Sequence, residues 1–144
     1  MDDDPYDLSR FTAAQDAGLT YQQAAAELRR GRKTGHWMWF VFPQIAGLGH
    51  SPTAQRYAIS SLDEARAYLA HPVLGPRLAE CAALAVQASQ GGRTAEQVFG
   101  PVDALKLRSS MTLFHRADPS HPVFGQVLSQ FFGGITDPAT DQRL

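Results

Sequence analysis

Apolar residues recur along most of this chain at spacings of three and four, the repeat expected of a helix with one buried face. One such stripe comprises Leu74, Leu78, Cys81, Ala85 and Ala88. Another comprises Leu107, Met111 and Phe114. Clear alternation of apolar and polar residues over the length of a strand is absent from the sequence. The pattern therefore predicts an all-α fold.

Capping signals divide this pattern into short helices. Asp7 is placed to cap a first helix that ends near Gly18. Thr20 and Gln23 form a capping box for a second helix, which Gly31 is expected to end. Further helix starts are predicted at Ser51-Pro52, Ser61, Thr94 and Pro101, and a last amphipathic helix contains Val123, Val127, Leu128 and Phe131.

These elements add up to about seven or eight short helices. The sequence shows no repeat, low-complexity linker or break in composition that would mark a second domain. We therefore predict a compact, irregular single-domain bundle over residues 1–144, with residues 1–6 as a flexible tail.

Composition places the protein among globular domains and gives it no general affinity for polyanions. Of its 144 residues, 44% are hydrophobic and 19% are charged, and the net charge is −1. No apolar run approaches the roughly 20 residues of a membrane span, and the N-terminus does not resemble a signal peptide. The single cysteine, Cys81, excludes an internal disulfide. We predict a cytoplasmic protein with no membrane partner.

Both tryptophans lie in the stretch 37–42, directly behind a basic run. The stretch is apolar on every side, so periodicity alone does not distinguish a buried helical turn from a short strand. A helical turn is favoured because the sequence offers no second convincing strand to pair with it. Pro43 is expected to end this element.

The first group of candidate ligand-binding residues is Arg32, Lys33, His36, Trp37 and Trp39. Arginine and lysine neutralise phosphate or carboxylate, and an indole face stacks on a base, a sugar or a cation. The combination suits a nucleotide-like ligand. The alternative is that the tryptophans fill the core, because buried aromatic side chains dominate the packing of a small domain. His36 has no partner nearby in sequence and is weak evidence for acid–base catalysis.

The second group is Lys106, Arg108, Ser109 and Ser110, which fall within about one helical turn; Gln44, at the end of the aromatic stretch, is a further candidate. Two cations and two hydroxyls in this arrangement suit an anion. The order is the reverse of the Ser-x-x-Lys motif of acyl-transfer enzymes, so no nucleophile is predicted. In the alternative interpretation, a serine in the middle of the helix allows close packing against another helix, and Lys106 extends along the edge of the buried face.

Other site chemistry is not predicted. The five histidines are dispersed and one cysteine is not enough for a structural zinc site, so neither a metal site nor a cofactor is expected. The glycines between Gly31 and Gly35 follow a helix and lack the strand–loop–helix context of a phosphate-binding loop. No catalytic residue is predicted, and whether the protein is an enzyme stays open.

Several long blocks resemble a bacterial domain-of-unknown-function family, number eighteen-ten. These blocks span residues 36–44, 47–52, 71–78, 105–114 and 131–134, including His36-Trp37-Met38-Trp39-Phe40-Val41-Phe42-Pro43-Gln44. The resemblance implies a compact all-α fold, as in a mycobacterial relative, and supplies no catalytic residues. Some members carry the label calpastatin, which would imply a protease inhibitor acting through disordered repeats; nothing in this chain resembles such repeats.

The leading hypothesis is that the chain binds a small anionic metabolite containing a nucleotide or a phosphate. If the protein is an enzyme, this metabolite would be its substrate. The pocket would lie between Trp37 and Trp39 on one side and the Lys106–Ser110 helix on the other, which requires these residues to share a cavity open to solvent. A non-enzymatic structural or protein-interaction module is the alternative, and it predicts an exposed apolar patch. A weak single-stranded nucleic-acid binder is the second alternative; the nearly neutral charge disfavours it.

Overall fold

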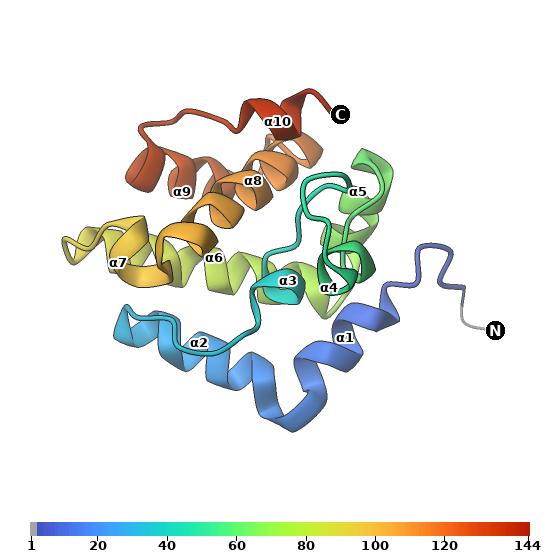
Figure 1. Cartoon of the computed structure of the whole chain (residues 1–144), viewed down its shortest axis with the longest axis horizontal. Helices are drawn as coiled ribbons and strands as arrows, with labels where there is room; N and C mark the ends of the chain where they lie inside the picture. The colour runs from blue at the N-terminus through green and yellow to red at the C-terminus, as the bar shows by residue number, and fades with distance from the viewer. Residues whose placement is uncertain (1–2) are drawn as a thin grey trace.

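Helix α6 (Leu74–Gln90) runs through the middle of the molecule, as Figure 1 shows for the computed structural model, which describes residues 3–144. Helix α2 (Thr20–Arg30) packs against α6, and so do α9 (Pro122–Phe132) and α5 (Leu62–Ala70). Helix α8 (Pro101–Ala117) packs in turn on α9 and α5. The core therefore lies between α6 and the helices around it.

Shorter helices complete the bundle, so the all-α prediction is confirmed. They are α1 (Ser9–Asp16), α3 (Met38–Val41), α4 (Pro52–Arg56), α7 (Ala95–Phe99) and α10 (Pro138–Asp141), with a 3₁₀ turn at Ala17–Leu19. Residues 3–144 contain ten α-helical segments, more than the expected seven or eight, because single turns such as α3 and α10 are included. Over residues 3–144 the only β-type pairing is an isolated parallel bridge between Ile45 and Ile59.

The two apolar stripes form the core as predicted. Leu107, Met111 and Phe114 of α8 are fully buried. The α6 stripe is also buried as far as Ala85, and burial raises the pKa of the Cys81 thiol to about 12, so this residue acts as a small apolar side chain. These two helices are the longest, at 17 residues each, and within the described chain no helix combines the length and apolar character needed to cross a membrane.

Most helix-end predictions are confirmed. Ser51 caps α4 and Ser61 caps α5, in each case by accepting a hydrogen bond from the backbone three residues ahead. Thr94 and Gln97 form the complete capping box of α7. Gly31 ends α2 with a φ of 76°, a conformation that glycine adopts without steric cost.

Two cap predictions at the N-terminus are wrong. The N-cap residue of α1 is Leu8 and not Asp7. The Asp4 carboxylate caps the helix start from four residues before this position, because it accepts hydrogen bonds from the backbone of Leu8 at 2.7 Å and of Ser9 at 3.0 Å. Thr20 forms no capping box, since its hydroxyl donates back to the carbonyl of Ala17 at 2.5 Å. In both places the chain turns just before the helix, and the turn brings these donors and acceptors together. Helical periodicity in the sequence does not predict such turns.

The segment around Asp4, which was predicted to be part of a flexible tail, forms a turn. The backbone N–H of Asp7 donates to the Asp4 carbonyl at 3.1 Å, which closes a turn, and Tyr6 packs half-buried against the core. Residues 4–6 therefore form a turn against the core, and the flexibility of residues 1–6 stays a prediction. Residues 1 and 2 lie outside the part of the chain that the structure describes.

Candidate functional site

A buried carboxylate on α2 organises the loop that carries the first group of candidates. Glu27 is 1% exposed, and its Oε1 accepts hydrogen bonds from the backbone of Thr34 at 2.7 Å and of Gly35 at 2.9 Å. The same oxygen accepts a bond from the indole Nε1 of Trp37 at 3.0 Å, and Oε2 accepts one from Gln23 at 3.0 Å. This one side chain therefore fixes the path from the end of α2 to the aromatic stretch.

Glu27 stays ionised at neutral pH in spite of its burial. Burial by itself raises the pKa of this carboxyl, but the hydrogen bonds from Gly35, Thr34, Trp37 and Gln23 together outweigh burial and lower the pKa to about 2. Sequence reasoning missed this residue. The available signal was its position, three residues after the buried Ala24 and directly before the buried Leu28.

Trp37 belongs to the core, and Trp39 lies at its edge. Trp37 is 1% exposed, so its role as a pocket wall is ruled out and the alternative that the indole fills the core is correct for this residue. Trp39, two positions later, is half-buried. The helical turn α3 causes the difference, because two positions on a helix point to nearly opposite sides.

Lys33 is held inside the structure by an ion pair. Its Nζ lies 2.8 Å from Asp103 Oδ2, donates to the carbonyl of Gly35 at 2.5 Å, and stands 5.0 Å from the Trp37 ring centroid. The Lys33 side chain is only 7% exposed. Because its charge is already paired, Lys33 supports the fold and is not available to an external anion.

Arg32 and His36 are exposed on the outside of the same loop. The loop path explains this, since Glu27 draws the intervening backbone of Thr34 and Gly35 inward. Neither side chain lines any of the hollows described below. The first group of candidates therefore does not converge on one site.

Asp103, which sequence reasoning also missed, joins the two cationic segments. One oxygen pairs with Lys33, and the other lies 3.7 Å from the Nζ of Lys106. The Lys106 ammonium stands 4.8 Å from the centroid of the Trp39 ring, within range of a cation–π interaction. The aromatic stretch and α8 thus meet at Trp39 and Lys106, with Asp103 behind them.

A hollow of about 350 Å³ opens beside this contact, and we call it the α8 hollow. Three segments form its walls: the loop after α3, one face of α8, and the segment leading into α10, which lies beside α8 in Figure 1. Its lining residues are Gln44, Leu48, Gly49, Val102, Leu105, Lys106, Arg108, Ser109, Asp137 and Ala139. A much smaller hollow, lined by Trp39 and Tyr57 among others, adjoins it across Gln44 and Gly49.

The α8 hollow contains four of the predicted residues, Gln44, Lys106, Arg108 and Ser109. The expectation that Trp37, Trp39, Lys106 and Ser110 would share one open cavity is wrong. Ser110 is fully buried, because it follows Leu107 by three positions and therefore points into the core. Its hydroxyl has no hydrogen-bond partner within residues 3–144.

Arg108 and Ser109 tie the C-terminal segment to α8. The Arg108 guanidinium donates to the carbonyl of Ile135 at 3.0 Å and to that of Thr136 at 2.6 Å. The Ser109 hydroxyl donates to Asp137 Oδ2 at 2.8 Å. These bonds build one wall of the hollow, so both residues position the site as well as line it.

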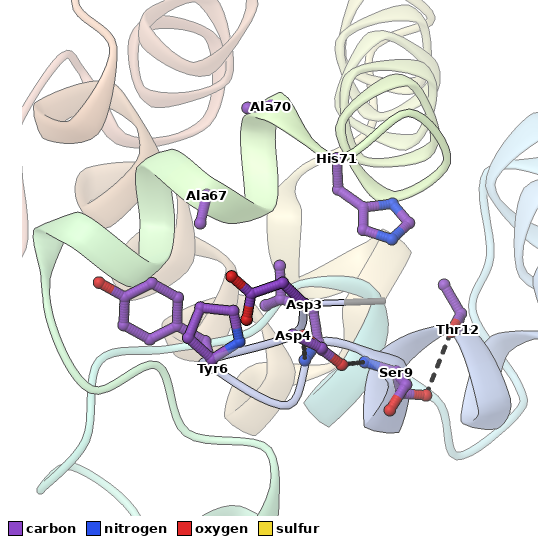
Figure 2. A pocket seen from close by; sticks show the side chains of 10 residues that line it. Asp3, Asp4, Tyr6, Ser9, Thr12, Ala67, Ala70 and His71 are labelled. Atoms are coloured by element: carbon purple, nitrogen blue, oxygen red, sulfur yellow. Dashed lines mark hydrogen bonds between the residues drawn. The ribbon is translucent and has the colours of Figure 1, made fainter. Parts of the chain in front are cut away.

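Two other large hollows carry none of the predicted residues, and neither does a smaller one of about 260 Å³ beside Arg66 and Asp118. The larger, about 520 Å³, lies between the N-terminal segment and the end of α5, where Figure 2 shows Asp3 and Asp4 across from His71. Both Asp4 oxygens are occupied in capping α1, and the acidic wall is unsuited to an anion. The other, about 410 Å³, lies beside His115 and Gly125. Over residues 3–144, no group of three or more His, Cys, Asp or Glu side chains is arranged to hold a metal ion.

Comparison with known proteins gives a family and one similar structure. A family model described as a protein of unknown function (DUF1810) matches residues 5–144. The crystal structure of the conserved hypothetical protein Rv1873 from Mycobacterium tuberculosis is similar, with 55% sequence identity and a TM-score of 0.93 over 98% of each chain. The curated proteins give no match.

Proposed function

This chain belongs to the family of proteins of unknown function DUF1810, and we propose that it binds a small phosphate-containing anion in the α8 hollow. The observation that carries the proposal is the position of Lys106. Lys106 lines the hollow, its ammonium stands 4.8 Å from the centroid of the half-buried Trp39 ring, and Asp103 Oδ1 lies 3.7 Å from it.

The charge of Lys106 is less neutralised than that of Lys33. Asp103 places one oxygen 2.8 Å from Lys33 and the other 3.7 Å from Lys106, so the closer pairing is with the buried lysine. Electrostatic attraction falls with distance, and the Lys106 side chain is a quarter exposed to solvent. An incoming phosphate oxygen would therefore find a positively charged group held in place by an aromatic ring.

Neighbouring groups complete a plausible anion site. The Gln44 side chain lines the hollow, and within the described chain it makes no hydrogen bond to another residue, so its amide N–H groups remain to donate. Arg108 adds a second positive charge to the same wall. Asp137 is the acidic residue of the lining, and it is occupied by the Ser109 hydroxyl.

The proposal is tested by isothermal titration of the full chain with inorganic phosphate, pyrophosphate and adenosine monophosphate. At least one of these should bind, and Lys106→Gln should weaken binding by about tenfold, the usual scale for a lost charge-assisted hydrogen bond. Arg30→Gln is the matched control, because it removes one exposed positive charge at the end of α2. Equal losses in both variants, or no binding by the wild type, would contradict the proposal.

A protein-interaction module is the second candidate, and one observation favours it. Val102 and Leu105 of α8 and the nearby Ile135 are large apolar side chains that stay exposed. An apolar patch of this kind also suits an apolar small-molecule ligand. A thermal-shift screen separates the two candidates, since a bound small molecule raises the melting temperature and a protein-interaction module gives no response to it.

Single-strand nucleic-acid binding has less support. It requires exposed rings beside the basic run, and Trp37 is buried while Lys33 is paired with Asp103. Arg29, Arg30 and Arg32 are exposed on this surface. Affinity for an oligonucleotide that falls steeply with added salt, and falls further in Arg32→Gln, would support this alternative.

We place this binding in the cytoplasm. The support is the single cysteine, Cys81, which is buried in the core and has no cysteine to pair with. A reducing compartment is the ordinary setting for such a chain. Fractionation of cells producing the native protein would test the assignment, and recovery in the membrane or extracellular fraction would contradict it.

A further inference from the structure

The residues that line the α8 hollow also indicate the chemistry of the rest of the ligand, beyond its anionic group. We infer that the bound phosphate is an ester with an apolar body, aromatic or aliphatic, in place of a sugar; this inference rests on the proposed function. The first observation is the lining, to which Leu48, Val102, Leu105 and Ala139 contribute only hydrocarbon side chains.

Two of these side chains are unusually exposed for their size. Val102 is 66% and Leu105 is 65% exposed, and their spacing of three places them on the same face of α8. Removing such surface from water is favourable in proportion to the area covered. A ligand with an apolar body would cover both residues while its charged group stays beside Lys106, on the same helix.

Two polar residues of the lining, Asp137 and Arg108, already bond within the structure. Asp137 Oδ2 accepts a hydrogen bond from the Ser109 hydroxyl at 2.8 Å, and two from Thr140, at 2.6 Å from the hydroxyl and 3.3 Å from the backbone. Arg108 donates to two backbone carbonyls. Sugar hydroxyls need several such partners when they leave water, and these bonds reduce the number that the lining offers to a polyol.

The volume of the α8 hollow limits the size of the ligand. The volume of about 350 Å³ lies near the lower end of the range of about 300–1,000 Å³ typical of ligand pockets. An apolar body of one ring or a short alkyl chain fits this space. The lining supplies Lys106 and Gln44 for the charged end and hydrocarbon side chains for the body.

Titration of the full chain with phenyl phosphate, ribose 5-phosphate and inorganic phosphate tests the inference. Phenyl phosphate is expected to bind about tenfold more tightly than ribose 5-phosphate, because both carry the same phosphate and differ in the body. If ribose 5-phosphate binds as tightly or more tightly, the inference is wrong and the proposed function stands. If none of the three binds, both are wrong.

Two variants test whether the apolar body of the ligand binds in the α8 hollow. Leu105→Gln should weaken phenyl phosphate binding about fivefold, and by more than it changes inorganic phosphate binding, since it replaces an apolar contact with a polar one. Leu19→Gln is the control: Leu19 is 68% exposed and lies outside the hollow, so this variant should bind both probes like the wild type. Equal loss of both probes in Leu105→Gln, or the same loss in Leu19→Gln, would overturn the inference.

Discussion

The indole Nε1 of Trp37 donates a 3.0 Å hydrogen bond to the carboxylate of Glu27, ten residues earlier in the chain. This bond connects the most aromatic stretch of the sequence to α2. The loop between them is held by the same carboxylate, so the aromatic stretch is anchored before it reaches α8. Trp39 is then presented to Lys106 from a fixed base.

Replacing Glu27 should therefore weaken the whole fold. We expect Glu27→Ala to lower the free energy of unfolding by about 3–5 kcal/mol, because the Trp37 donor would be buried without an acceptor and the backbone of Thr34 and Gly35 would lose its partner. Glu27→Gln retains one oxygen and should cost about half as much. Urea denaturation followed by circular dichroism measures both, and a loss below about 1 kcal/mol in the alanine variant would contradict the anchoring role.

The same carboxylate should make stability depend on acid pH. The pKa of Glu27 is lowered from 4.5 in a model compound to about 2 in the fold, so the unfolded chain binds more protons between these values. The stabilisation is therefore complete above about pH 4.5 and is lost as pH falls towards 2, with a size on the order of 3 kcal/mol. Urea denaturation at a series of pH values should show this slope. Glu27→Gln should remove the contribution of Glu27 and leave that of Asp4 and Asp141, whose pKa values are also lowered by hydrogen bonds.

Asp103→Asn should have opposite effects on stability and on anion binding. The variant leaves Lys33 unpaired at 7% exposure, which we expect to cost about 2 kcal/mol of stability. It also removes the carboxylate nearest to Lys106, so phosphate affinity should rise about twofold to threefold. Asp63→Asn, at the exposed pair with Arg66, is the control and should change neither quantity. Weaker phosphate binding in Asp103→Asn would count against the assigned role of Lys106.

The two serines of α8 should respond differently to removal of the hydroxyl. Ser110 is buried with no hydrogen-bond partner in the described chain, so Ser110→Ala should be neutral or slightly stabilising. Ser109 donates to Asp137, and Ser109→Ala should cost about 1 kcal/mol. Thermal denaturation compares them directly. A Ser110→Ala protein that loses more stability than Ser109→Ala would show that Ser110 has an unrecognised partner.

Gly75 marks a close approach of two helices that admits no side chain. A Cβ atom at this position would lie 2.1 Å from the carbonyl oxygen of Leu69, so α5 and α6 would have to separate. We expect Gly75→Ala to cost about 3 kcal/mol or more. Gly91→Ala, where the nearest atom would be 3.4 Å away and φ is −76°, should change stability by less than about 1 kcal/mol. Similar melting temperatures for the two variants would contradict this close contact.

Helical periodicity predicted the fold well because burial on one face decides most of it. The stripes through Leu78 on α6 and Leu107 on α8 are the core that the pattern predicted. Periodicity failed where a side chain bonds to a distant backbone. Asp4 in place of Asp7 caps α1 after a turn that no local pattern specifies, and Glu27 is a buried charge whose partners become available only when the loop folds.

The candidate site was predicted in part, for a related reason. Residue types in the two blocks suggested an anion, and Lys106 and Trp39 do stand against each other. Composition does not give the rotation of each residue about its helix, so Trp37 and Ser110 were assigned to the pocket although both point into the core. Asp103, the residue that connects the blocks, resembles an ordinary acidic residue in the first turn of a helix.

The placement of the two tryptophans has a practical consequence for experiments. Trp37 is buried beside Glu27, whereas Trp39 is half-buried under Lys106, a residue of the proposed binding site. Since the chain contains no other tryptophan, its intrinsic fluorescence has two emitters in different surroundings. One reports whether the polypeptide is folded, and the other responds to whatever approaches the lysine, so occupancy can be followed optically without attaching a dye.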